Sequence, residues 1–298
     1  MNDLLVKING KQIKITNSDR ILFGKSGITK LELVQYYERI APLMIPHIKN
    51  RPISMQRFPD GIGAEGFYQK DASDYFPSWI KRYNVKREDK TKVIHHVLCN
   101  DAPTLVYLAT QAVITPHIWL STVKSIHKPD QIIFDLDPSE GCSFDTVMFM
   151  AKRCRQLLQK LGLHPFVKTT GSRGLHVTVP IIPERDFDAV RTFAREIAQI
   201  LVNENPEHAT LEMRLHKRQE KVFIDYLRNA WGQTAVAPYA VRAREGAPVA
   251  TPLEWRELTK SLMPQKYTIK NIFRRIARKG DLWKDMHASA VSIKSIKL

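Results

Sequence analysis

Two aspartates interrupt an otherwise apolar run, Ile132-Ile133-Phe134-Asp135-Leu136-Asp137-Pro138. The β-branched and aromatic residues before Asp135 predict a buried strand, in which side chains at positions i and i+2 lie on the same face. Two carboxylates on one face of a core strand repel each other unless a cation compensates them. Hard divalent ions prefer oxygen ligands, so the pattern predicts a metal site for phosphoryl chemistry. Alternatively, one Asp starts a turn before Pro138 while the other pairs with a buried arginine.

The charge balance indicates the class of partner. The 298 residues include 46 Lys and Arg against 30 Asp and Glu, a formal net charge of +16. This excess indicates a polyanionic partner, most simply nucleic acid. Residues 81–92 and 274–279 are especially basic. Either segment alone could be a solvated face, but together with the metal motif they favour a nucleic-acid track.

The cysteines and the N-terminus indicate the compartment. Cys99, Cys142 and Cys154 follow no C-x-x-C spacing, so we expect neither a disulfide framework nor a structural zinc site. The first residues lack a basic region followed by a long apolar stretch, so no secretion signal is expected. We therefore expect a reducing, cytoplasmic compartment and association with the nucleoid.

One uncharged stretch could be mistaken for a membrane span. No Asp, Glu, Lys or Arg occurs between Asp101 and Lys124. The stretch contains Gln111, Pro116 and His117, which favours a buried helix followed by a strand. No membrane partner is expected.

The N-terminal part predicts a small module. Residues 6–15 alternate around Asn9-Gly10, the strongest short-range hairpin signal. Thr29-Lys30-Leu31-Glu32 is a capping box, so a helix begins there and continues through Ile40. Further short strands are predicted at 53–58, 66–69 and 93–98.

The later part predicts an α+β core. From Gln131 the order is strand, helix (144–161, capped by Ser143), strand (166–169), turn, strand (176–180), helix (187–203) and a strand through Val222-Phe223-Ile224-Asp225-Tyr226. We predict a single domain over 1–298, with an N-terminal module at 1–100 and a catalytic core at 101–298.

Two further motifs complete a candidate active site. Thr170-Gly171-Ser172-Arg173-Gly174-Leu175-His176 forms a turn in which hydroxyls, backbone N–H groups, a guanidinium and an imidazole suit a triphosphate. A plain hairpin explains this turn equally well by itself. Asp225 adds a third carboxylate from another apolar strand. Three such carboxylates can hold two metals about 3.5 to 4 Å apart, as in polymerases and nucleases.

Together these motifs resemble the archaeo-eukaryotic primase superfamily in order and spacing. More closely, the chain resembles the polymerase domain of bacterial ligase D, the repair polymerase of non-homologous end joining. Segments 16–23, 66–70, 117–120 and 238–250 carry the closer resemblance over almost the whole chain. The implied fold is a primase-like (RRM-like) catalytic core, with mixed and antiparallel sheets flanked by helices, plus a smaller N-terminal α/β module.

The resemblance also implies residue roles. The catalytic, metal-binding residues would be Asp135, Asp137 and Asp225. The nucleotide would be surrounded by Thr170, Ser172, Arg173, His176, His117, Arg242 and Arg244, a DNA 5′-phosphate by Asn17, Arg20 and Lys30, and template bases would stack on Phe67 and Tyr68. In the loop 216–221, Arg218 is a candidate contact with a DNA end, although the loop also reads as an exposed hairpin tip. The chain departs from the family at Thr170, where Ser is common, and at Arg20, where Lys is common.

The implied activity is template-directed nucleotidyl transfer at gaps and broken DNA ends, with NTP or dNTP as substrate. A primer 3′-hydroxyl would attack the α-phosphate with the help of two Mn²⁺ or Mg²⁺ ions, while His176, Arg242 and Arg244 neutralise triphosphate charge. The family tends to prefer ribonucleotides and Mn²⁺. Expected partners are double-stranded DNA ends, gapped DNA with a 5′-phosphate, Ku and, because no K-x-D-G motif occurs, a separate ligase.

Three other functions fit parts of the pattern. A haloacid-dehalogenase-like phosphatase shares the first motif, but it usually has Thr or Val at the position of Ser139 and gives the charge of +16 no role. A two-metal nuclease would not need the triphosphate-binding turn, and a non-catalytic DNA end-bridging module would not need the three aspartates. The residues leave open the sugar preference, primase activity against extension, templated against untemplated addition, the oligomeric state and the identity of the ligase.

Overall fold

The computed structural model describes residues 2–86 and 92–296, which fall into two compact units. The first unit contains residues 1–124, 234–250 and 268–274, and the second contains 125–233, 251–267 and 275–298. This grouping differs from the predicted division at residue 100. Residues 101–124 belong with the N-terminal part because their strand β9 (Val113–Trp119) pairs with β5 (Ile53–Arg57).

The predicted hairpin opens the first unit. Strands β1 (Leu4–Ile8) and β2 (Lys11–Ile15) pair antiparallel around Asn9 and Gly10. These two residues have φ angles of 45° and 80°, the left-handed backbone that a two-residue hairpin turn requires. The hairpin prediction is therefore confirmed.

The capping box also forms as predicted. Thr29 and Glu32 exchange side-chain and backbone hydrogen bonds at the start of helix α1 (Lys30–Ile48). The helix runs past its predicted end at Ile40, and past two internal prolines, because Met44 and Ile48 extend its buried face.

A four-stranded antiparallel sheet, in the order β15-β9-β5-β6, forms the centre of the first unit. The uncharged stretch folds as helix α2 and strand β9, as predicted. Among the described residues, no helix is long and apolar enough to cross a membrane.

The other elements of this unit are β3 (Ile21–Phe23), β4 (Ile28–Thr29), β6 (Phe67–Gln69), β7 (Arg82–Lys86), β8 (Val93–Val97), α2 (Ala102–Thr110) and β15 (Thr234–Val236). Part of the basic segment 81–92, namely residues 87–91, lies outside the described residues.

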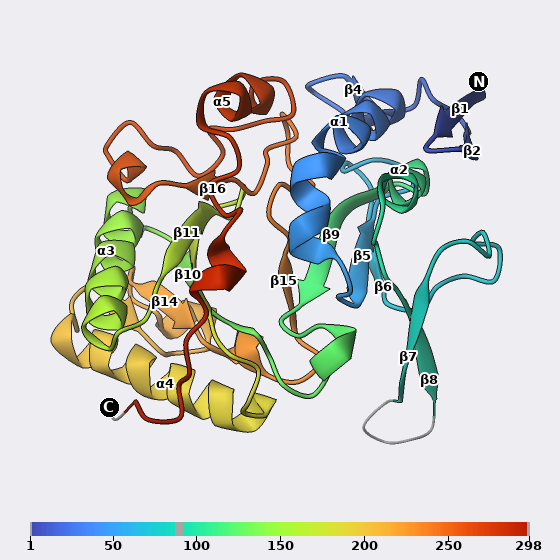
Figure 1. The fold of residues 1–298 in the computed structure, drawn as a ribbon. Helices are drawn as coiled ribbons and strands as arrows, with labels where there is room; N and C mark the ends of the chain where they lie inside the picture. The colour runs from blue at the N-terminus through green and yellow to red at the C-terminus, as the bar shows by residue number, and fades with distance from the viewer. Residues whose placement is uncertain (1, 87–91, 297–298) are drawn as a thin grey trace. The chain divides into compact units, whose positions relative to one another are not determined.

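A six-stranded sheet, in the order β13-β14-β10-β12-β11-β16, forms the second unit. All pairs of neighbouring strands in it are antiparallel except β13 and β14, which are parallel. Helices α3 and α4 lie along one side of it and contact its central strands (Figure 1). The elements are β10 (Gln131–Pro138), α3 (Phe144–Lys160), β11 (Phe166–Thr169), β12 (Leu175–Pro180), α4 (Phe187–Glu204), β13 (Ala209–Thr210), β14 (Val222–Asp225) and β16 (Pro252–Leu253); α5 (Ile272–Lys279) spans the boundary between the units.

Alternation along β10 places the two aspartates. Ile132, Phe134 and Leu136 are fully buried in the core that includes side chains of α3 and α4. Asp135 and Asp137 therefore face the other side of the sheet. The predicted α+β class and the strand that carries both aspartates are confirmed.

Asn229 extends the pairing of β10 beyond the end of β14. Strand β14 pairs with β10 only from Asp135 to Pro138. At Ile133, the Asn229 side chain accepts a hydrogen bond from the backbone N–H (2.9 Å) and donates one to the backbone carbonyl (2.8 Å). Asn229 is fully buried and thus substitutes for a strand neighbour.

We expect Asn229→Ala to lower the free energy of unfolding by about 2 to 4 kcal/mol, because a buried N–H and a buried carbonyl lose their partner. Urea denaturation measures the change. Asn203→Ala, at an exposed position of α4, is the matched control and should change stability by less than about 0.5 kcal/mol. Equal effects of the two variants would contradict this role.

Candidate active site

A row of polar side chains crosses four strands of the six-stranded sheet. Lys168 on β11 is the register partner of His176 on β12, His176 that of Asp135 on β10, and Asp135 that of Asp225 on β14. Directly opposed residues of neighbouring strands share a face. Asp137 lies two residues beyond Asp135 on the same face. The second unit therefore brings the three predicted carboxylates together beside His176.

Arginines already neutralise all three carboxylates. The Arg228 Nε lies 3.2 Å from an Asp225 oxygen and 3.7 Å from an Asp135 oxygen. Asp137 is paired with Arg173 at 3.2 Å and with Arg218 at 3.3 Å. Pairing with arginine was the alternative explanation for one aspartate of the first motif. In the structure, all three aspartates are paired with arginine.

Arg218 is a buried part of this charge cluster. Its side chain is 9% exposed, so it does not lie at an exposed hairpin tip. It donates hydrogen bonds to the backbone carbonyls of Glu212 (3.0 Å) and Met213 (3.1 Å), and its guanidinium lies 4.0 Å from the centre of the Phe223 ring. The predicted contact of Arg218 with a DNA end stays a prediction, and it would require the side chain to leave Asp137.

The environment separates the pKa values of neighbouring aspartates. Burial alone would raise the pKa of Asp135, but His176, Arg228 and Lys168 outweigh it and lower that pKa to about 2. Burial raises the pKa of Asp225; Arg228 opposes this rise, and the negative charge of Asp135 adds to it. Asp135 is therefore a stable anion, whereas the ionised form of Asp225 is disfavoured.

His176 carries no charge at neutral pH. Burial, followed by the positive charge of Lys168, lowers the pKa of this imidazole to about 4. Its Nε2 lies 3.4 Å from an Asp135 oxygen, and its buried Nδ1 has no hydrogen-bond partner among the described residues. The imidazole can thus hydrogen-bond a ligand, and its role in neutralising triphosphate charge stays a prediction. Of the second-unit residues predicted to surround the nucleotide, Arg173 is the exposed cation.

The hydroxyl of Thr170 closes the predicted triphosphate turn. It accepts hydrogen bonds from the backbone N–H groups of Ser172 and Gly174, each at 3.2 Å, and donates to the Gly174 carbonyl at 3.1 Å. Serine or threonine can supply these bonds, so the departure from the family at this position keeps the turn intact. Thr170 shapes the turn, while Ser172 and Arg173 are more exposed.

Gly174 lets the turn lie directly against β10. A Cβ atom at this position would stand 2.1 Å from the backbone carbonyl oxygen of Leu136. Any other residue would push the turn away from the strand between Asp135 and Asp137. The glycine thus fixes the spacing between the turn and the carboxylates.

The predicted 5′-phosphate residues lie together in the first unit. The Arg20 N–H donates to the Asn17 carbonyl at 3.0 Å, and the Lys30 N–H donates to the Arg20 carbonyl at 2.8 Å. The buried Lys30 Nζ donates to the Thr16 carbonyl at 2.7 Å, whereas Arg20 is paired with Asp60 at 2.9 Å. Burial and then the positive charge of Arg20 lower the pKa of Lys30. An anion placed between these cations would relieve their repulsion.

The remaining predicted residues also belong to the first unit. Phe67 and Tyr68 on β6 are exposed, and the Tyr68 ring lies edge-on to His117 of β9 at 5.4 Å. Arg242 and Arg244 occupy a tight turn closed by a hydrogen bond from the Ala247 N–H to the Arg244 carbonyl at 3.0 Å. The three carboxylates and the triphosphate turn belong to the second unit.

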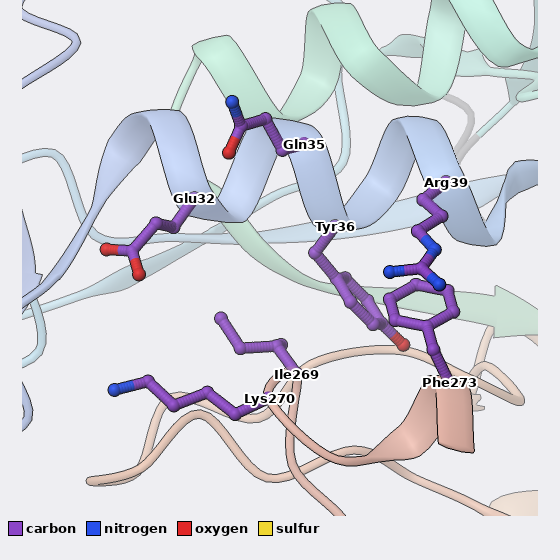
Figure 2. Close-up of a pocket in the computed structure, with 7 residues that line it drawn as sticks. All are labelled: Glu32, Gln35, Tyr36, Arg39, Ile269, Lys270 and Phe273. Carbon is purple, nitrogen blue, oxygen red and sulfur yellow. The ribbon is translucent and has the colours of Figure 1, made fainter. Parts of the chain in front are cut away.

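A hollow of about 230 Å³ lies in the first unit, between α1 and residues 269–273 (Figure 2). The Arg39 guanidinium lies 3.9 Å from the centre of the Phe273 ring, and Tyr36 packs near the same ring at 5.7 Å. These contacts attach residues 268–274 to α1. The hollow is lined by Glu32, Gln35, Tyr36, Arg39, Ile269, Lys270 and Phe273, none of which is a predicted site residue.

The three carboxylates fit divalent metals by their chemistry. They are hard oxygen donors on one face of one sheet, and a cation is required to compensate them. Within residues 2–86 and 92–296, no group of three or more His, Cys, Asp or Glu side chains converges on a common metal position. The carboxylates instead engage Arg173, Arg218 and Arg228.

Sequence reasoning missed two members of the cluster, Arg228 and Lys168. Arg228 follows Asp225 by three residues, in the short 3₁₀ helix Leu227–Asn229. Lys168 is 1% exposed within the apolar strand before the triphosphate turn. The available signal was a lysine within an apolar strand. Alternation alone does not place it on the same face as His176, because that also requires the register between the two strands.

Comparisons with known proteins show the family to which the chain is similar. The family model "LigD, primase-polymerase domain" matches residues 29–283. The chain is 32% identical to the bifunctional non-homologous end joining protein LigD of Bacillus subtilis over 90% of its own length and 43% of that protein. It is 31% identical to the multifunctional LigD of Mycolicibacterium smegmatis over 94% of its own length and 37% of that protein. The chain thus spans less than half the length of these relatives.

A solved structure shows the same fold. The polymerase domain of Mycobacterium tuberculosis ligase D, in complex with DNA, matches with a TM-score of 0.86 and 30% identity. The match covers 93% of this chain and 98% of that one. The predicted primase-like α+β fold is therefore confirmed.

Asp135 and Asp225, which are opposed on neighbouring strands, should affect the free energy of unfolding in opposite directions at pH 7. Folding raises the pKa of Asp225, so its charge weakens the fold; Asp225→Asn keeps the acceptor for the Leu227 N–H (2.8 Å) and should raise the free energy of unfolding. Folding lowers the pKa of Asp135 from 3.8 to about 2, so its charge stabilises the fold above pH 4 and this contribution is lost toward pH 2. Asp135→Asn should cost about 1 to 2 kcal/mol at pH 7, where Arg228 and Lys168 remain charged and His176 is neutral.

Urea denaturation of both variants at pH 7 and at pH 3 measures these changes. Each aspartate is the control for the other because they occupy opposed positions in one ladder. The destabilisation by Asp135→Asn should shrink at the lower pH. Changes of the same sign in both variants at pH 7 would contradict the assigned charge states.

Proposed function

Because the chain belongs to the LigD primase-polymerase domain family, we propose that it adds nucleotides to DNA at gaps and broken ends in non-homologous end joining. One observation carries the proposal: Asp135, Asp137 and Asp225 share a sheet face with the triphosphate turn. Carboxylates and phosphate-binding donors on one surface are what nucleotidyl transfer needs.

Asp135, Asp137 and Asp225 would hold the divalent ions. When bound, such ions supply charge stabilisation for phosphoryl transfer and lower the pKa of the attacking hydroxyl. Arg173 and Arg228 now neutralise these carboxylates from positions that are about half exposed. Once released from the carboxylates, the same guanidinium groups can bind substrate phosphates, for which their planar geometry is suited.

The nucleotide would lie over the turn 170–176. Ser172 and Arg173 offer a hydroxyl and a guanidinium, and neutral His176 offers a hydrogen bond that adds no charge. From the family resemblance, we also propose that His117, Arg242 and Arg244 contact the nucleotide. Preference for ribonucleotides and for Mn²⁺ is proposed from the family resemblance.

The first unit would bind DNA. Arg20, Lys30 and Asn17 suit a 5′-phosphate because backbone hydrogen bonds from Arg20 to Asn17 and from Lys30 to Arg20 hold two cations and an amide close together. Phe67 and Tyr68 suit template bases, on which exposed aromatic rings stack. The relatives are described as bifunctional or multifunctional end-joining proteins. We propose Ku and a DNA ligase activity as the partners of this domain, acting at the nucleoid.

We expect Asp137→Ala to abolish primer extension while DNA affinity changes by less than about threefold, because the carboxylate faces the phosphoryl site rather than the DNA-binding residues. The assay extends a labelled primer across a short gap with a downstream 5′-phosphate, with Mn²⁺ and either ribo- or deoxyribonucleotides. Asp188→Ala, at an exposed position of α4, should extend like the wild type.

The same assay separates the other functions. Shortening of the labelled strand by the wild type would indicate a two-metal nuclease. Tight DNA binding without nucleotide addition would indicate an end-bridging module. Normal extension by Asp137→Ala would exclude the carboxylates from the chemistry.

We expect Arg20→Ala and Lys30→Met to remove the preference for a 5′-phosphorylated gap, because each loses a charged hydrogen-bond donor worth about 1.5 to 3 kcal/mol, or roughly tenfold or more in affinity. Fluorescence anisotropy with phosphorylated and unphosphorylated gapped DNA gives the ratio of dissociation constants. Lys14→Met, which removes another lysine of this unit, is the control and should keep the wild-type ratio. Unchanged ratios in both test variants would place the phosphate elsewhere.

A further inference from the structure

Exposed aromatic rings gather in one region of the first unit. Among the described residues, four aromatic side chains of Phe, Trp or Tyr are strongly exposed: Phe67 (47%), Tyr68 (57%), Tyr75 (62%) and Phe149 (41%). The first three lie on β6 or in the loop that follows it. Exposed apolar surface that gathers in one place commonly marks a binding site.

Arg57 connects Tyr75 to the predicted template-binding strand. Its Nη1 donates to the Tyr75 hydroxyl at 3.1 Å and to the Gln69 side-chain oxygen at 2.6 Å. Its guanidinium also lies 5.5 Å from the centre of the Phe67 ring. Tyr75 and Phe67 therefore flank one guanidinium.

The loop that carries Tyr75 is held in place from both sides. The Gln69 side-chain amide donates to the Ser73 hydroxyl at 2.9 Å and to the Asp71 carbonyl at 2.7 Å. Arg82 on β7 donates to the Phe76 carbonyl at 3.0 Å. The Tyr75 ring itself packs edge-on against the buried Phe76 at 5.2 Å. An exposed ring held in this way loses little conformational freedom when a ligand stacks on it.

We propose that Tyr75 is a further stacking position for an unpaired nucleobase, next to the predicted template positions Phe67 and Tyr68. The inference rests on the proposed function and extends it to a residue that the family motifs do not include. Charge favours a nucleic acid over a protein partner, because Lys70 and Arg82 are exposed beside these rings in a chain of net charge +16. Aromatic rings interleaved with cations are the usual surface for single-stranded nucleic acid.

The affinity test compares Tyr75→Leu and Tyr75→Phe with the wild type, using gapped DNA that carries a single-stranded template tail. Tyr75→Leu should weaken binding about five- to tenfold, because it removes the aromatic face, and leave the slope of log K against log salt unchanged, because no charge is lost. Tyr75→Phe keeps the face and should bind within about twofold of the wild type. Phe149→Leu, on α3 of the second unit, is the matched control and should bind like the wild type.

Photocrosslinking gives a direct readout. A 5-iodouracil placed at successive tail positions reacts with an aromatic ring on which it stacks, and mass spectrometry identifies the linked residue. We expect one position to link to Tyr75 and this link to be absent in Tyr75→Leu. Wild-type affinity of Tyr75→Leu together with no link to Tyr75 would overturn the inference, as would an equal loss in Phe149→Leu.

The two levels of the proposal fail separately. If the wild type binds and extends tailed DNA but no base reaches Tyr75, the stacking inference fails and the polymerase function stands. If the wild type neither binds nor extends that DNA, the proposed function fails.

Discussion

Charge compensation on one face of a β-sheet is the constraint on which the candidate site depends. Helices α3 and α4 cover one face of the six-stranded sheet, so every second residue of β10 projects from the other face. Three aspartates lie on that face, and each is paired with an arginine. Carboxylates this close would otherwise raise one another's pKa values and lose their charge. A metal ion could replace the arginines at the carboxylates, and a substrate phosphate could replace the carboxylates at the arginines.

The surrounding elements preserve this arrangement by close backbone contact. Gly174 brings the turn 170–176 against Leu136, and Thr170 closes the turn from within. Asn229 satisfies the backbone of Ile133 where β14 no longer reaches it. Each contact acts on β10 or on the turn beside it. The position of the aspartates is therefore set by backbone geometry more than by their own side-chain contacts.

Much of the fold and the core of the site could be predicted from the sequence. Period-two alternation identified the strand of Asp135 and Asp137, and the capping box and the Asn9-Gly10 turn identified α1 and the first hairpin. The resemblance identified a family and an enzyme class, nucleotidyltransferase, that the matches to LigD proteins confirm. These signals are local, or they are motifs in linear order.

The missed features depend on register and burial. Lys168 joins the polar row only because β11 pairs with β12 at His176, and no linear pattern states that pairing. Burial makes His176 neutral and takes Arg218 out of solvent, although both residue types predict surface charge from the sequence. The tertiary environment sets the charge of His176 and the burial of Arg218.

The course of the chain explains why the first unit is not one contiguous segment. After strand β14 is complete, the chain returns to pair β15 with β9 and to give Tyr36 a hydrogen-bond acceptor, the Tyr239 carbonyl, at 2.7 Å. It returns once more at residues 268–274, where Phe273 packs on Arg39. Residues 1–124 alone would therefore lack an edge strand and the cover of α1. The first unit is therefore built from three separate stretches of the chain, and no contiguous N-terminal segment contains all of it.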